Sequence, residues 1–186
     1  MPPMLRHIAW FNEAPIEPLP EGGLTSSAPD VCRRCLAPAR EIEKLGVACS
    51  VFGNLHDADP VQVGQHLQQL NTDIVVIGCI SGPSRLKLAR AAKHLGCYVV
   101  ADIDAEEPGD DLARLLQVAD QVVAATPERA AALLAQTDLH AIVIPDCDEK
   151  GFGGHSPAAV AKLWLECFRQ LKLKPPASAN SNSPQN

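Results

Sequence analysis

The 186-residue sequence contains few aromatic residues, no long hydrophobic run and no cluster of basic residues. Aromatics make up 4% of the chain, so its 46% hydrophobic content must build a core mainly from Ala, Leu, Ile and Val. We expect no membrane span, because no apolar stretch reaches the length that crosses a bilayer, and no signal peptide at the N-terminus. A formal net charge of −6 without a Lys/Arg cluster argues against a nucleic-acid partner.

Two phosphate-binding signatures are also absent. No G-x-G-x-x-G pattern joins the first apolar run to the helix-like segment after it, which argues against a dinucleotide-binding domain. No Walker P-loop occurs either, which lowers the odds of an ATPase or a kinase. We therefore expect no cofactor.

The seven cysteines are scattered, and their number is odd. With no export signal, the pattern predicts reduced, buried thiols in a cytoplasmic protein. Cys32 and Cys35 form a C-x-x-C pair, but no second pair supplies the two further ligands that a zinc site needs. A long loop separates the pair from the first strand, unlike a thioredoxin-type motif. We expect two helix-packed thiols and no metal, and neither a Ser-His-Asp nor a Cys-His set of catalytic residues can be assigned.

Short apolar runs alternate along the chain with segments that carry apolar residues at helical spacing. This alternation predicts an α/β fold: one Rossmann-like, doubly wound parallel sheet of about six strands, with helices on both faces. Right-handed crossovers lead us to expect the strand order 3-2-1-4-5-6. The runs are Ile8–Phe11, Val47–Phe52, Ile74–Ile80, Tyr98–Ile103, Gln121–Ala125 and Ala141–Ile144.

The chain reads as one domain over residues 1–174, followed by a disordered Pro/Ser/Asn-rich tail over 175–186. Residues 12–29 form an unusually long connection, which favours a functional loop, and Asp30 is the expected N-cap of the helix that follows. A last helix begins at Ser156-Pro157 and is expected to pack on the sheet. Its apolar stripe comprises Leu163, Trp164, Cys167, Phe168 and Leu171.

An acidic run follows the fourth predicted strand, where sheets of this class place their ligands. Asp102 and Asp104 fall on one face by strand alternation and could accept hydrogen bonds from sugar hydroxyls. The alternative is a solvated loop whose carboxylates favour a helix start. Asp102 is the exception, because a carboxylate that ends an apolar strand needs a partner: backbone N–H groups, Arg33 or Arg34, or a hydroxyl ligand.

Gly22 and Gly23 lie in the long loop after the first strand. Glycine allows backbone N–H groups to approach an anion or a sugar closely, and a helix follows. The alternative is a flexible loop that only needs glycine to turn.

Taken in order, several short motifs resemble the amino-terminal, acceptor-side domain of GT-B fold glycosyltransferases over about residues 6–148. The motifs are Glu21-Gly22-Gly23, Arg33/Arg34-x-x-x-Pro38-Ala39-x-x-Ile42-x-x-x-Gly46, Asp73-Ile74-Val75-Val76, Gly96 to Asp104, Ala119-Asp120-Gln121-Val122-Val123-Ala124-Ala125-Thr126 and Ile142-Val143-Ile144-Pro145-Asp146.

The resemblance implies a ligand-binding role for five residues. Gly22 and Gly23 would face the interdomain cleft, Asp102 and Asp104 would lie beside the acceptor, and Thr126 would be the hydroxyl residue after the fifth strand. The sequence departs from the family at Gly78-Cys79-Ile80-Ser81, where a His is frequent. The family's second domain, which holds the sugar nucleotide, is also missing from the sequence.

Three functions remain open at this stage. The chain could be a split glycosyltransferase subunit whose protein partner carries the nucleotide-sugar donor domain. It could be a non-catalytic module that binds an acceptor or another sugar-like small molecule. The alternative is an unrelated Rossmann- or flavodoxin-like small-molecule-binding or regulatory domain. In each case we expect the isolated chain to be inactive as a glycosyltransferase.

Overall fold

The computed structural model describes residues 4–55, 58–78, 83–103, 110–148 and 154–172. Six strands form one parallel sheet, as the sequence predicted, in the order β4-β1-β5-β6-β7-β8. They are β1 (His7–Phe11), β4 (Ala48–Phe52), β5 (Ile74–Gly78), β6 (Tyr98–Ile103), β7 (Gln121–Ala124) and β8 (Ile142–Val143).

The expected strand order 3-2-1-4-5-6 is wrong. Counted along the chain, the sheet strands lie in the order 2-1-3-4-5-6, because β5 adds beside β1 rather than outside β4. The right-handed crossover rule fixes the hand of each connection but not the side on which the next strand adds. Burial decides the side: Ile74–Ile77 of β5 are at most 2% exposed, whereas Ala48–Phe52 of β4 remain partly exposed at the sheet edge.

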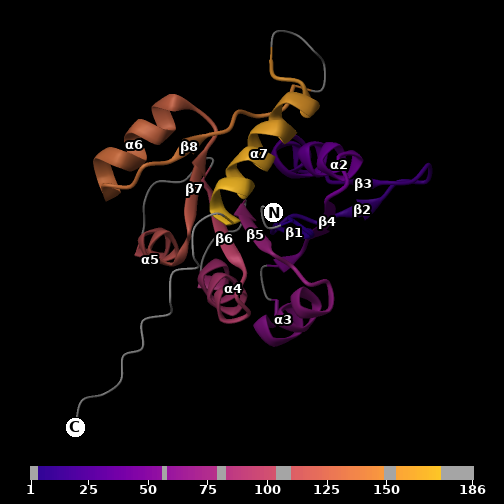
Figure 1. The fold of residues 1–186 in the computed structure, drawn as a ribbon, viewed down its shortest axis with the longest axis horizontal. Coiled ribbons are helices and arrows are strands. Elements are labelled where there is room, and N and C mark those ends of the chain that lie inside the picture. Colours follow the sequence, from indigo (N-terminus) through magenta and orange to yellow (C-terminus); the bar gives the residue numbers. More distant parts are fainter. Residues whose placement is uncertain (1–3, 56–57, 79–82, 104–109, 149–153, 173–186) are drawn as a thin grey trace.

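Helices cover both faces of this sheet, as predicted (Figure 1). One core layer lies under α2 (Ala37–Lys44) and α7 (Pro157–Lys172), and the opposite layer lies under α3 (Pro60–Gln69), α4 (Pro83–His94) and α5 (Asp110–Val118). The helix α6 (Pro127–Thr137) connects β7 to the last strand and contributes Leu133 to the second layer.

The last helix packs on the first strand, as expected. The ring centroids of Trp10 in β1 and Trp164 in α7 lie 5.0 Å apart in an edge-to-face arrangement, and Phe168 also contacts Trp10. The predicted apolar stripe is wrong at Leu163, which is 43% exposed. Val160, one turn earlier, is fully buried instead, so the buried face is rotated slightly from the predicted one.

The long connection after β1 contains a short antiparallel hairpin, β2 (Glu17–Pro18) and β3 (Leu24–Thr25), which the sequence did not predict. A helical segment follows as α1 (Pro29–Val31), a π-helical turn η1 (Cys32–Leu36) and then α2. The expected N-cap at Asp30 is wrong: Ala28 holds that position and Pro29 opens the helix. Proline suits the first helical position because its missing N–H would have no helical partner there.

No helix in the described parts of the chain is both long enough and apolar enough to cross a membrane. The predicted tail over residues 175–186 lies outside the described residues, as does the end of the predicted domain at 173–174.

Candidate functional site

The carboxyl edge of the sheet has a topological switch point between β1 and β5. From β1 the chain first passes outward to β4 under one face of the sheet, then returns under the other face to β5. Helix α2, which follows β1, and helix α4, which follows β5, consequently cover opposite faces, and open α/β sheets bind ligands in the crevice that forms at such a point. Asn12 follows β1 at this edge, Gly78 ends β5, and Asp102 lies opposite Gly78 in β6.

Asp102 and Arg34 form a bidentate ion pair at this edge. The Arg34 Nε donates to Asp102 Oδ2 at 2.9 Å, and Arg34 Nη2 donates to Asp102 Oδ1. Arg34 is 3% exposed and Asp102 is 6% exposed, so both charges lie in the interior. Paired donors that match both carboxylate oxygens are the geometry that makes a buried charge tolerable. The sequence predicted that Asp102 needs a partner, and the structure identifies Arg34.

Asp146 completes the network from the segment after β8. Arg34 Nη1 donates to Asp146 Oδ1 at 2.6 Å and to the Ile144 carbonyl oxygen at 3.1 Å. The Asp146 side chain is 35% exposed, so it is the member of the network that solvent reaches. Burial alone would lower the pKa of Arg34, but the charges and hydrogen bonds of Asp102 and Asp146 raise it above its ordinary value. The Arg34 guanidinium therefore stays charged.

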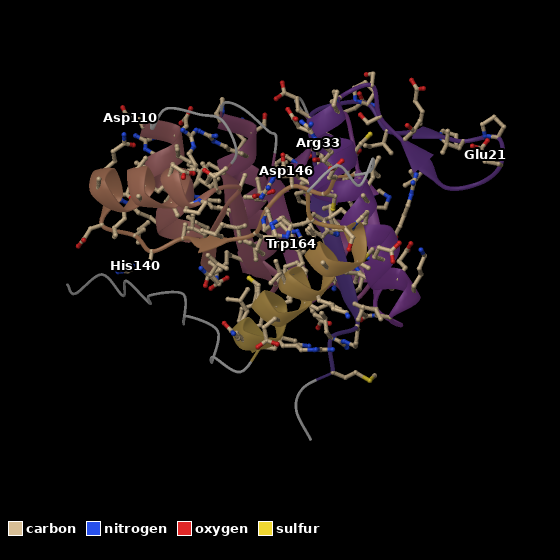
Figure 2. The ribbon with its side chains drawn as sticks, turned by 90° about the horizontal axis from the view of Figure 1, so that it is seen from above. Glu21, Arg33, Asp110, His140, Asp146 and Trp164 are labelled. Carbon is tan, nitrogen blue, oxygen red and sulfur yellow. The ribbon has the colours of Figure 1, made fainter. Side chains whose placement is uncertain are left out.

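A π-helical turn positions the arginine. Arg34 lies in η1, where the wider turn replaces regular α-helix between α1 and α2. Such turns are rare in proteins and frequently occur at functional sites. The neighbouring Arg33 is exposed and lies 4.0 Å from Asp146 through its Nε, while its Nη2 also contacts Asp30. Figure 2 shows Arg33 and Asp146 near one another at this edge.

The two cysteines of the C-x-x-C pair pack against the same segment. Cys35 is 3% exposed, and its Sγ accepts a hydrogen bond from Asn12 Nδ2 at 3.4 Å. Cys32 is half-buried and donates to the Ser26 carbonyl oxygen. Both cysteines lie in the helical segment η1, in agreement with the expected helix-packed role. The described residues contain no group of three or more His, Cys, Asp or Glu side chains that could hold a metal ion.

Thr126 lies at the same sheet edge, directly before α6. Its Oγ1 accepts a hydrogen bond from the Arg129 backbone N–H at 3.2 Å, so the hydroxyl caps the helix. Asp110 and Asp111 of the acidic run fall in the first turn of α5, as the helix-start alternative predicted. Asp104, with Glu106 and Glu107, lies outside the described residues.

Gly22 and Gly23 form the turn of the β2–β3 hairpin rather than part of the sheet edge. Their φ angles of +94° and +91° are favourable only for glycine, and the Leu19 N–H donates to the Gly23 carbonyl oxygen across the turn. Both glycines line an open cavity of about 820 Å³ between the hairpin and α2. Figure 2 shows the adjacent Glu21 at the far tip of the hairpin, away from Arg33 and Asp146. The two glycines and Asp102 therefore do not share one small site.

Sequence reasoning missed two residues of this site. Asn12 is a 2% exposed polar residue directly after β1, and Asp146 follows the last strand, β8, after Ile144 and Pro145. Both could have been found by asking which polar residues end a strand, because the carboxyl ends of parallel strands meet at one edge.

No protein-family model matches the chain, and no curated protein matches it either. Among solved structures it is similar to Acinetobacter baumannii MurG, with a TM-score of 0.53 and 15% identity. The similarity covers 75% of this chain and 45% of the MurG chain, so the chain spans less than half of MurG. Agreement at this identity concerns the fold alone.

A second solved structure is less similar to this chain in shape. A deoxy-D-mannose-octulosonate 8-phosphate phosphatase from Haemophilus influenzae, solved with cobalt, has a TM-score of 0.38 and 10% identity. The similarity covers 91% of this chain and 90% of the phosphatase. At that TM-score it supports no functional conclusion.

Proposed function

We propose that this chain is an acceptor-side domain of the GT-B glycosyltransferase type, which binds a sugar-like ligand at the carboxyl edge of its sheet. The likeness to MurG, a GT-B glycosyltransferase, supports the fold comparison and is compatible with a half-domain. The single observation that carries the proposal is the carboxylate Asp102, held in the interior at the switch point by Arg34.

The chemistry of this edge suits a ligand rich in hydroxyl groups. Ionised carboxylates only accept hydrogen bonds, and sugar hydroxyls donate them. Arg34 fixes the direction of both Asp102 and Asp146, and the 35% exposed Asp146 offers oxygen lone pairs to solvent. Thr126, which follows β7 at the same edge, and Asp104, which the sequence resemblance implies, complete the proposed ligand set. Gly22 and Gly23, which the sequence resemblance also implies as ligand-binding residues, belong to the proposed site only if the ligand is long enough to reach the hairpin.

Catalysis in this proposal requires a donor domain. GT-B enzymes close two domains over the reaction, which excludes water and completes the site. We propose either that a protein partner carries the domain that binds the nucleotide sugar, or that the chain binds its ligand without catalysis. By itself the chain is expected not to transfer sugar from a nucleotide donor and to bind such donors weakly.

The test is a titration of the isotope-labelled chain with glucose, N-acetylglucosamine and a uridine diphosphate sugar, followed by NMR. We expect saturable shifts at residues around Asn12, Arg34 and Asp146, and a roughly tenfold weaker affinity in Asp146→Asn, which removes one charge-assisted acceptor. Asp138→Asn is the matched control, because Asp138 ends α6 at the opposite edge of the sheet. Equal affinities of the two variants, or sugar turnover by the purified chain, would contradict the proposal.

The strand order favours a second candidate. The order 2-1-3-4-5-6 is the flavodoxin-like order with one further strand, and that fold binds phosphate-bearing ligands at the switch point next to its first strand. A small-molecule-binding or regulatory domain of this kind would bind uridine diphosphate as well as its sugar conjugate. Binding that depends on the phosphates and not on the sugar therefore supports this second function.

A further inference from the structure

The outer edge of β4 presents backbone groups that pair with no other strand among the described residues. Alternate residues of a strand direct their N–H and C=O groups to opposite sides. Ala48 donates to the Arg6 carbonyl oxygen and Phe52 accepts from the Asn12 N–H, so Ala48, Ser50 and Phe52 face β1. Cys49 and Val51 consequently direct two N–H and two C=O groups outward. In the sheet formed by the described residues, β4 is an edge strand with no neighbour on that side.

A groove follows this edge. A cavity of about 440 Å³ lies along β4 between α2 and α3, which cover opposite faces of the sheet (Figure 1). Its apolar lining includes Leu36, Ala39 and the 40% exposed Leu70. The cavity shares Gly23, Arg40 and Glu43 with the larger cavity beneath the hairpin, so the two adjoin. We call the combined surface the β4 groove.

The acidic side chains of the β4 groove outnumber its basic ones: Glu21, Glu41 and Glu43 line it, against Arg40 and Lys44. The Arg40 guanidinium donates to the Leu24 carbonyl oxygen, and Lys44 pairs with Glu41. Glu43 lines both cavities and Glu21 lines the outer one. The chain also carries a net charge of −6. The groove therefore attracts a positively charged segment more strongly than a neutral or an acidic one.

We propose that the β4 groove binds an extended, basic segment of a partner protein by β-strand addition. The outward groups of Cys49 and Val51 supply main-chain hydrogen bonds, the apolar lining accepts alternate side chains, and Glu43 and Glu21 contact basic residues. A second copy of this chain fits less well, because the α2 and α3 helices of that copy would collide with the α2 and α3 helices that form the walls of the groove. The inference is independent of the ligand proposed for the carboxyl edge.

The probe is a fluorescein-labelled peptide of alternating lysine and valine, measured by fluorescence anisotropy against the full chain. We expect saturable binding that weakens as salt is raised. Two peptide controls need no change in the protein. An analogue methylated on its internal backbone nitrogens keeps the charge but cannot donate to β4, and an analogue with glutamate in place of lysine keeps the donors but reverses the charge. Each should bind at least tenfold more weakly.

The matched protein variants are Val51→Pro and Val51→Ala. Proline removes the outward N–H of residue 51 without touching the bonds between β4 and β1, and edge strands tolerate it when the lost N–H faces solvent. Val51→Ala also removes both methyl groups of the valine side chain, but it keeps the N–H. We expect Val51→Pro to bind the probe at least fivefold more weakly than Val51→Ala, with unchanged circular dichroism. Cys49→Pro, which removes the other outward N–H, replaces Val51→Pro if that variant does not fold.

Three results would overturn the proposal. The first is the absence of saturable binding at probe concentrations up to about 1 mM, where a free energy of only about −4.1 kcal/mol would suffice. The second is equal affinity for the methylated peptide, which would mean that the strand edge is not used. The third is a dimer by light scattering that Val51→Pro dissociates, since the edge would then pair with a second copy.

Discussion

Replacing Asp102 with alanine should destabilise the chain strongly, because the change removes the bidentate, buried partner of the Arg34 charge. Removing one partner of a buried ion pair costs about 3–5 kcal/mol. Arg34 keeps its bonds to Asp146 and the Ile144 carbonyl oxygen, so we expect the lower end, about 3 kcal/mol. For a domain of this size, each kcal/mol corresponds to roughly 2–4 °C, so Tm should fall by about 6–12 °C.

The assay is urea and thermal unfolding followed by circular dichroism on three variants. Arg34→Met should cost a similar amount, since it leaves the 6% exposed Asp102 without its bidentate partner. The loss of stability in the double variant should be roughly 1–3 kcal/mol smaller than the sum of the two single losses. The reason is that each substitution removes the buried charge that the other substitution leaves without its partner. Glu166→Ala, an exposed position on α7, is the control and should stay within about 0.5 kcal/mol of the parent.

A loss below about 1 kcal/mol for Asp102→Ala would refute this reasoning. Additive effects of the two single changes would refute it as well, because additivity means that the side chains do not interact. The same series bears on the proposed ligand site. If Asp102→Ala destabilises the fold and leaves sugar binding intact, the carboxylate has a structural role only.

Two further predictions concern His7 and Thr126. Burial lowers the pKa of His7, partly offset by the charge of Asp73, so the unfolded chain binds a proton more readily and the free energy of unfolding should decrease as pH falls below about 6.5. His7→Gln should flatten that decrease in urea titrations at several pH values, and an unchanged slope would contradict the assignment. Thr126→Ala should cost about 1 kcal/mol through loss of the α6 cap, whereas Thr126→Ser should restore it; equal stabilities of the two variants would show that the hydroxyl does not cap the helix.

The strands were predictable because Val- and Ile-rich runs such as Val99-Val100 and Val75-Val76 are buried on both faces of a parallel sheet. The order of the strands in the sheet was not predictable in the same way, since no local sequence pattern specifies whether β5 pairs with β1 or with β4. One signal was nevertheless present. The run Ile74–Ile77 is wholly apolar, whereas β4 contains Ser50, and the more apolar run belongs in the interior of a sheet.

The types of residue in the site could be predicted from the sequence, but their arrangement in space could not. A carboxylate at the end of an apolar strand required a partner, and two adjacent arginines were the candidates. Adjacent helical residues differ by about 100° in direction, so only the helical phase decides which one turns inward. The π-helical turn η1 sets that phase, and the amino-acid sequence of Cys32–Leu36 contains no pattern that predicts a π-helical turn. The hairpin around Gly22 was missed because its two strands are only two residues each.

The packing of α7 on β1 has a consequence for how the chain is made. Trp10 leaves the ribosome well before the side chains that cover its indole, because Trp164 and Phe168 are synthesised about 150 residues later. Contacts so distant in sequence form slowly, because a long loop must close before they contribute. Until residues 157–172 emerge, the part of this sheet face that α7 covers, beside α2, stays uncovered. The nascent domain therefore presents this apolar surface to chaperones until α7 has been synthesised.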